Sequence, residues 1–155
     1  MRLSLQVQYA VCGVFDLAYN GQAAPVQIRV IGERQGIPPR YLEQIFQRLR
    51  RAHLVISKRG PGGGYTLSRP AAEITLRDVV EAVEGPLEGR ARRGRTPTDK
   101  PLAAREASYR PGFLWPQLAQ SISEVLAKTT IDALCREAAR SSVRRAQPDS
   151  HMYFI

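Results

Sequence analysis

A glycine-rich turn between two short β-prone runs constrains the fold of this chain more than any other feature. The runs are residues 54–58 (LVISK) and 65–68 (YTLS), and the turn between them reads RGPGGG. Directly before the first run, residues 39–52 carry apolar side chains at spacings of three and four, the pattern of an amphipathic helix. A helix followed at once by a glycine-tipped hairpin predicts a winged helix-turn-helix.

The same apolar periodicity predicts further helices. We expect helices over residues 4–19, 26–35, 39–52 and 75–84, a longer one that begins at Phe113, and a shorter one over 131–140. Asn20-Gly21 and Gly36 end the first two, because these residues tolerate the left-handed conformation at a helix C-terminus. The predicted fold class is therefore mainly α with a small β-hairpin.

Composition divides the chain into four parts. Residues 1–84 hold the predicted winged helix-turn-helix DNA-binding domain. Residues 85–112 are rich in proline, glycine and arginine, which is typical of a flexible basic loop; it either contacts DNA flanks or serves as a solvated tether. Residues 113–140 are expected to form a C-terminal dimerisation helix and a short terminal helix, and 141–155 a disordered tail.

The helix that begins at Phe113 carries a continuous apolar stripe that needs a packing partner. A second copy of the chain would satisfy it, and a two-fold pair also matches a palindromic DNA site. The alternative is that this helix packs back onto residues 1–84. We predict a homodimer.

The charge of the chain favours a polyanionic partner. It carries 23 Lys and Arg against 14 Asp and Glu, a formal net charge of +9. No acidic residue lies between Glu43 and Glu73, whereas six basic residues do. They are Arg48, Arg50, Arg51, Lys58, Arg59 and Arg69. A solvated basic face is the alternative, but their place on a helix and a hairpin favours double-stranded DNA.

The candidate DNA-binding residues lie on the third helix and the hairpin. Arg59 is placed to enter a narrow minor groove, where the negative potential is enhanced. The glycines after it, Gly62 and Gly63, would let the backbone approach DNA closely. We expect phosphate contacts from Lys58, Arg48 and Arg51.

The start of the third helix is expected to read base edges. The candidates are Arg40, Tyr41, Glu43 and Gln44. Glu43 can accept a hydrogen bond from a cytosine amino group. Alternatively, it pairs with Gln47 or with an arginine one turn further on.

Other function classes find little support in the sequence. His53 has no nucleophile near it in sequence, and the glycine run lacks the Gly-Lys-Ser/Thr ending of a phosphate-binding loop. We therefore predict no enzymatic activity. We also predict a cytoplasmic protein. The chain has only two cysteines, Gln6 and Gln8 interrupt its apolar N-terminal run, and no apolar stretch is long enough to cross a membrane.

Several motifs together resemble the Rrf-type bacterial regulators, the family of IscR, NsrR and CymR. They are MRLS at 1–4, YA at 9–10, ERQGI at 33–37, YLEQIF at 41–46 and RGPGGGY at 59–65. The resemblance covers residues 1–84, and residues 114–118 and 129–130 are similar to the dimerisation helix of the family. It implies a homodimeric, sequence-specific transcriptional regulator, expected to be a repressor, that reads DNA through Tyr41, Glu43 and Arg59.

The chain departs from this family in one respect. Many members hold an iron–sulfur cluster through three cysteines in the loop before the dimerisation helix. Here residues 85–112 contain no cysteine and no histidine, and the corresponding positions are Arg92, Thr98 and Ala104. Because such clusters need sulfur ligands, we expect no cluster, no other cofactor and no metal.

The signal that such a regulator would sense stays open. Cys12 and Cys135 are either small core residues or redox sensors. A different function is also open, in which the winged helix is a protein-interaction module that docks a partner enzyme and binds little DNA.

Overall fold

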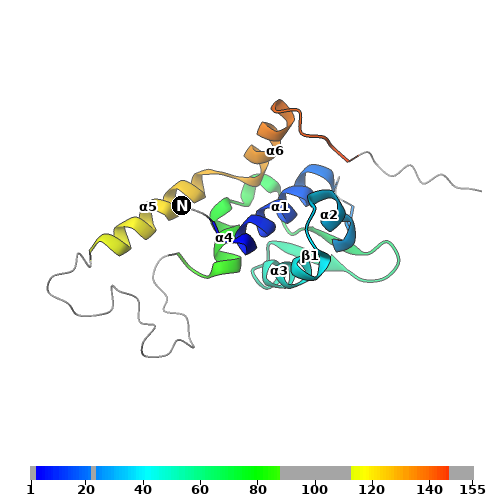
Figure 1. The fold of residues 1–155 in the computed structure, drawn as a ribbon, viewed down its shortest axis with the longest axis horizontal. Helices are drawn as coiled ribbons and strands as arrows, with labels where there is room; N and C mark the ends of the chain where they lie inside the picture. The colour runs from blue at the N-terminus through cyan, green and yellow to red at the C-terminus, as the bar shows by residue number, and fades with distance from the viewer. Residues whose placement is uncertain (1–2, 22–23, 88–112, 147–155) are drawn as a thin grey trace, which may run out of the picture.

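The computed structural model describes residues 3–21, 24–87 and 113–146 (Figure 1). The elements, in chain order, are α1 (Leu5–Asn20), α2 (Ile28–Gln35), α3 (Pro39–Arg51), β1 (Val55–Lys58), β2 (Gly64–Leu67), the short 3-10 helix η1 (Ala71–Glu73), α4 (Leu76–Glu84), α5 (Leu114–Lys128) and α6 (Ile131–Arg140). The architecture is mainly helical with one two-stranded antiparallel sheet, as predicted.

Helix α1 forms the centre of the core. Its predicted apolar stripe is buried at Val7, Ala10, Val14 and Leu17, and it packs against α2, α3, α4 and α6. Gly13 lets α1 approach α3 closely, since a Cβ at this position would lie 2.7 Å from the Phe46 ring. The core therefore fixes α3 by direct packing against the central helix.

The wing, residues 55–67, is a hairpin whose strands pair from Val55 with Leu67 to Lys58 with Gly64. Val26 adds a bridge at its edge: its N–H donates to the Tyr65 carbonyl at 2.9 Å, and the Tyr65 N–H donates back at 2.8 Å. The second helix consequently begins at Ile28 and not at Val26 as predicted, because Val26 is held in an extended conformation.

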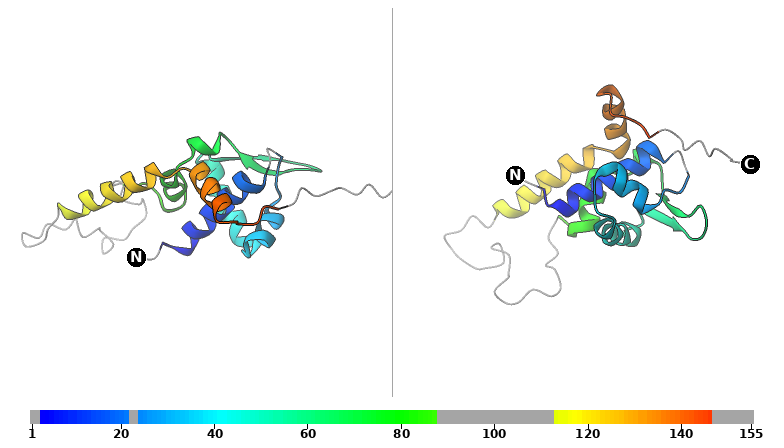
Figure 2. Two further views of the ribbon diagram at one scale, coloured as in Figure 1. Left: turned by 90° about the horizontal axis from the view of Figure 1, so that it is seen from above. Right: turned by 45° about the vertical axis from the view of Figure 1, so that its right-hand side comes forward.

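Helix α5 forms an arm that projects from the body at the end opposite to the wing (Figures 1 and 2). It contacts α4, whereas α6 turns back and packs on α1 and η1. Ile131, at the start of α6, is fully buried in the main core. The two C-terminal helices thus have different surroundings.

Residues 141–146, expected in a disordered tail, instead lie against the end of α1. The Tyr19 hydroxyl donates to the Val143 carbonyl at 3.0 Å, and the Ala146 N–H donates to the Asn20 side chain at 2.8 Å. The Arg145 guanidinium lies 4.6 Å from the centre of the Tyr19 ring. Residues 147–155, and residues 88–112 of the predicted basic loop, lie outside the described residues.

Among the described helices, none is both long enough and apolar enough to span a bilayer.

Candidate nucleic-acid interface

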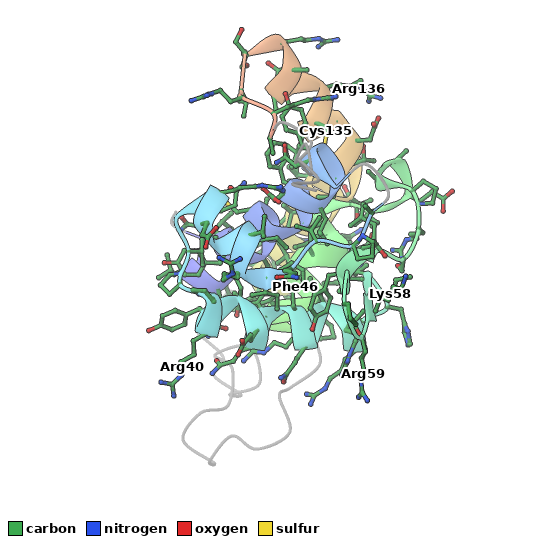
Figure 3. All side chains as sticks on the ribbon, turned by 90° about the vertical axis from the view of Figure 1, so that its right-hand side faces the viewer. Arg40, Phe46, Lys58, Arg59, Cys135 and Arg136 are labelled. Atoms are coloured by element: carbon green, nitrogen blue, oxygen red, sulfur yellow. The ribbon has the colours of Figure 1, made fainter. Side chains whose placement is uncertain are left out.

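Helix α3 and the wing face the same side of the molecule. Figure 3 shows Arg40 at the start of α3 and Arg59 on the wing, both projecting from one side, with Lys58 next to Arg59. Cys135 and Arg136 of α6 lie at the opposite end in the same view. A helix and a basic hairpin on one side form the arrangement that a duplex requires.

The amphipathic character of α3 decides which of its residues reach this side. Leu42, Ile45, Phe46 and Leu49 are buried in the core. The predicted base-reading residues lie on the other face and are all exposed: Arg40, Tyr41, Glu43 and Gln44. Pro39 occupies the first turn, where its missing N–H costs no hydrogen bond.

Most predicted contact residues have no polar partner of their own in the described part of the chain. There, no hydrogen bond or ion pair involves the side chains of Arg40, Glu43, Gln44, Arg51, Lys58 or Arg59. The alternative for Glu43, a pairing with Gln47 or an arginine one turn on, is therefore not formed among the described residues. Tyr41 is 57% exposed, and its ring centre lies 6.4 Å from that of Tyr9.

Arg48 differs from the other predicted phosphate contacts. Its guanidinium donates to the Gln6 side chain of α1 at 2.8 Å and to the Val83 carbonyl of α4 at 3.2 Å. The side chain is half-buried and holds α3 against two neighbouring helices. These contacts distinguish Arg48 from Arg51 and Lys58, and its phosphate contact stays a prediction.

The wing tip contains glycines with different roles. Gly60 and Gly62 have φ angles of 91° and 70°, and both have open space around the position of a Cβ. Gly63 is buried, and a Cβ there would lie 2.4 Å from the Lys58 carbonyl oxygen. Gly62 has room to face DNA. Gly63 is needed to close the turn itself, and the close approach of its backbone to DNA stays a prediction.

Gly64, which was not among the predicted site residues, is required both by its backbone conformation and by its surroundings. Its φ is 150°, and a Cβ would lie 2.5 Å from the backbone of Val26. The signal available in sequence was a fourth glycine at the first position of the second strand. Its reason, the bridge to Val26, depends on a segment far away in the chain.

The two thiols pack against the core. Cys12 is on α1 and Cys135 on α6, and both are half-buried. Burial raises the pKa of the Cys12 thiol. Burial and the negative charge of Asp132 raise the pKa of Cys135, against a smaller lowering by Arg145.

Comparison with known proteins identifies the family. The family model Rrf2, described as an iron-dependent transcriptional regulator, matches residues 3–137. The chain belongs to the Rrf2 family. This confirms the resemblance found in the sequence.

The relatives of this Rrf2 protein match all or part of its length. A candidate HTH-type transcriptional regulator of Neisseria meningitidis serogroup A, NMA1593, is 34% identical over 159 residues, covering 99% of this chain and 100% of the relative. IscR of Escherichia coli O1:K1 is 50% identical over 84 residues, which are 54% of this chain and 52% of IscR. The solved structure of T. potens IscR superposes with a TM-score of 0.69 at 31% identity over 94% of each chain.

These findings confirm the winged helix-turn-helix fold and the predicted function class: the Rrf2 protein is a DNA-binding transcriptional regulator.

The family description names iron, but this Rrf2 chain does not supply the ligands that an iron–sulfur cluster needs. The sequence holds two cysteines, and residues 85–112 contain neither cysteine nor histidine. Within the described ranges, no three or more His, Cys, Asp or Glu side chains come together as a metal site. An iron–sulfur cluster needs several thiolates, which these residues do not supply.

Proposed function

We propose that the protein represses transcription by binding a two-fold DNA operator as a homodimer, without an iron–sulfur cluster and without enzymatic activity. It acts in the cytoplasm, where the chromosome of a bacterium is found. The observation that carries the proposal is the set of exposed side chains without polar partners on α3 and the wing. Arg40 and Arg59, one from each element, project from the same side of the molecule (Figure 3).

Each element has its own part in this proposal. Helix α3 lies in the major groove, where Arg40, Tyr41, Glu43 and Gln44 contact base edges. Arg51 and Lys58 contact phosphates, and Arg59 enters the minor groove beside the wing. Gly62 at the tip allows the backbone to come close, since it carries no Cβ.

The arm formed by α5 supports the dimer. Its exposed apolar residues include Leu114, Trp115, Leu118 and Val125. Leu114, Leu118 and Val125 share one face at helical spacing, and buried Ser123 lies half a turn away from them. The apolar face therefore points away from the body of its own chain, and a second copy of α5 would cover it.

Replacing Arg59 with alanine tests the DNA contact of the wing. We expect operator binding to weaken by about 1–3 kcal/mol, the value of a specific contact, or roughly 5- to 150-fold in affinity. The measurement is a fluorescence anisotropy titration at fixed salt, with an operator selected from random DNA by the wild-type protein. Arg136→Ala is the matched control, since it removes the same charge at the opposite end of the molecule (Figure 3).

The salt dependence of wild-type binding tests whether DNA is the partner at all. Several phosphate contacts per dimer give an affinity that falls steeply with salt concentration. A flat response would contradict the proposal and favour the protein-interaction module. Equal affinities for Arg59→Ala and Arg136→Ala would remove Arg59 from the interface.

A further inference from the structure

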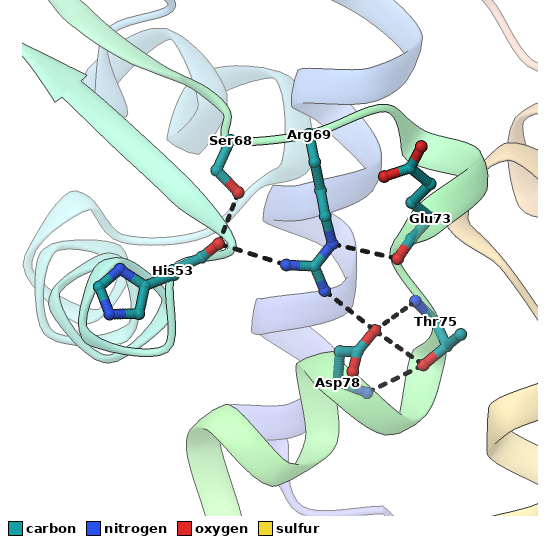
Figure 4. Close-up of polar contacts among 6 residues, drawn as sticks. All are labelled: His53, Ser68, Arg69, Glu73, Thr75 and Asp78. Carbon is teal, nitrogen blue, oxygen red and sulfur yellow. Dashed lines mark hydrogen bonds and ion pairs between the residues drawn. The ribbon is translucent and has the colours of Figure 1, made fainter.

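Arg69, at the end of the wing, is bound to the protein through all three of its guanidinium nitrogens (Figure 4). Its Nε donates to the Glu73 carbonyl at 3.1 Å, and its Nη1 donates to the His53 carbonyl at 3.4 Å. Its Nη2 forms an ion pair with Asp78 Oδ2 at 3.3 Å. One side chain thus connects the end of α3, η1 and the first turn of α4.

The residue that links α3 to the wing has an unusual backbone conformation. His53 adopts a φ of 57°, a conformation that L residues other than glycine rarely adopt. Its carbonyl also accepts a hydrogen bond from the Ser68 hydroxyl at 2.5 Å. Ser68 and Arg69 together therefore hold the His53 carbonyl group at the point where α3 ends and the wing begins.

On the other side of Arg69, Asp78 is part of the cap of α4. Its Oδ2 accepts from the Thr75 N–H at 2.9 Å and from the Thr75 hydroxyl at 3.0 Å. The Asp78 N–H donates to the Thr75 hydroxyl at 3.2 Å, which completes the capping box. The anchor for Arg69 is thus a carboxylate that is itself fixed at the start of a helix.

The start of α4 is in turn bonded to the end of the arm. The Leu76 N–H donates to the Thr129 carbonyl at 2.9 Å, and the Ile131 N–H donates to the Ile74 carbonyl at 2.8 Å. Thr75 and Thr130 form the bridge between these bonds. A continuous set of contacts therefore runs from the α5–α6 connection through Asp78 and Arg69 to the wing.

We propose that Arg69 is a positioning residue that fixes the angle of the wing relative to α3 and to the dimer arm, so that Arg59 meets the minor groove in register with the recognition helix. This inference rests on the proposed function. It gives Arg69 a role different from that of Arg51, Lys58 and Arg59. Those three residues would bind DNA by charge, whereas Arg69 acts through the geometry of its guanidinium.

Substitution by lysine separates these two roles. Lysine keeps the charge but cannot donate in three directions from one rigid plane. For Arg69→Lys we expect an operator affinity about tenfold lower, the loss of one specific contact. Hydroxyl-radical footprinting should show weaker protection where the wing lies, while the major-groove contacts of α3 persist.

Asp78→Ala provides a second test, because simple electrostatics and the proposed role of Arg69 predict opposite changes in DNA affinity. Removing a negative charge from a DNA-binding protein strengthens binding if charge alone matters. If Arg69 needs its anchor, Asp78→Ala weakens binding as Arg69→Lys does. Glu81→Ala is the matched control, because it removes the same charge from the same helix and leaves the Arg69–Asp78 ion pair intact.

A measurement without DNA makes failure of this inference distinguishable from failure of the proposed function. Amide hydrogen exchange of the free protein should show faster exchange in residues 55–67 for Arg69→Lys and Asp78→Ala than for wild type and Glu81→Ala. Wild-type exchange rates in both variants would show that Arg69 does not hold the wing, whatever the protein binds. Wild-type operator affinity for Arg69→Lys, or tighter binding by Asp78→Ala, would overturn its role in DNA positioning.

Discussion

Cys12 and Cys135 illustrate how surroundings decide the chemistry of single residues. The thiolate is the reactive form of cysteine, and burial raises the pKa of both thiols, which leaves less thiolate at neutral pH. For Cys135 the nearby Asp132 acts in the same direction, and Arg145 opposes both. These surroundings favour core residues over redox sensors.

We therefore expect slow alkylation of both thiols by iodoacetamide at pH 7, with rates that rise as the pH approaches the raised pKa values. Peroxide at low concentration should leave operator binding unchanged. Mass spectrometry of the alkylated protein and an anisotropy titration after oxidation check the two expectations. Rapid labelling at neutral pH, or release of DNA by peroxide, would instead support a redox-sensor role for one of the cysteines.

The arginines show what sequence reasoning could not predict at this scale. Arg48 and Arg59 both lie in a stretch without acidic residues and both looked available for DNA. The partner of Arg48 on α1, Gln6, is 42 positions away, and Val83 is 35 positions away. Whether a guanidinium is free depends on such distant partners, which helical periodicity does not report. Arg69 is hidden from sequence reasoning in the same way.

At the scale of elements, the wing depends on Gly64, which lies in strand β2 and not in the turn. Gly64→Ala would place a Cβ 2.5 Å from the Val26 backbone at a φ of 150°. We expect a loss of about 2–3 kcal/mol in the free energy of unfolding from strain and overpacking. Gly62→Ala has open space and should cost about 1 kcal/mol, for its left-handed φ alone.

Urea unfolding followed by circular dichroism compares the two variants. An equal cost for both would show that the Val26 bridge is not what requires glycine at position 64.

The helices were predictable to within a few residues because their signals are local. Apolar periodicity located α1, α3 and α4. The start of α2 was wrong because Val26 pairs with Tyr65, a residue of the distant wing. The order of residues 141–146 was missed for the same reason, since Tyr19 and Asn20 hold them from the far end of the chain.

At the scale of the whole molecule, the sequence indicated an apolar stripe after residue 113 but not where it would point. Periodicity shows that a face is apolar, and it cannot tell a second copy from the chain's own body. In the structure α5 contacts α4 of its own chain but leaves Leu118 and Val125 exposed, and this exposed face supports the proposed dimer.

Val125→Asp tests the dimer. This side chain is 64% exposed, so the fold of the single chain should be unchanged, whereas a charge on the proposed contact face should separate the two copies. We expect a monomer by sedimentation and an operator affinity lower by about 100-fold or more, since one half-site contact is lost. Gln117→Asp adds the same charge on the polar face of α5 and is the control. Dimers of Val125→Asp would place the contact elsewhere.

The arm and the wing leave the body at opposite ends (Figures 1 and 2). When two molecules join through their arms, the hairpins come to lie outermost. The proposed arginine contact is then made at the margins of the bound site, outside the bases that the two helices touch. Base composition there should matter through groove width alone: A·T-rich margins, whose minor groove is narrow, should bind more tightly than G·C-rich margins around an unchanged centre.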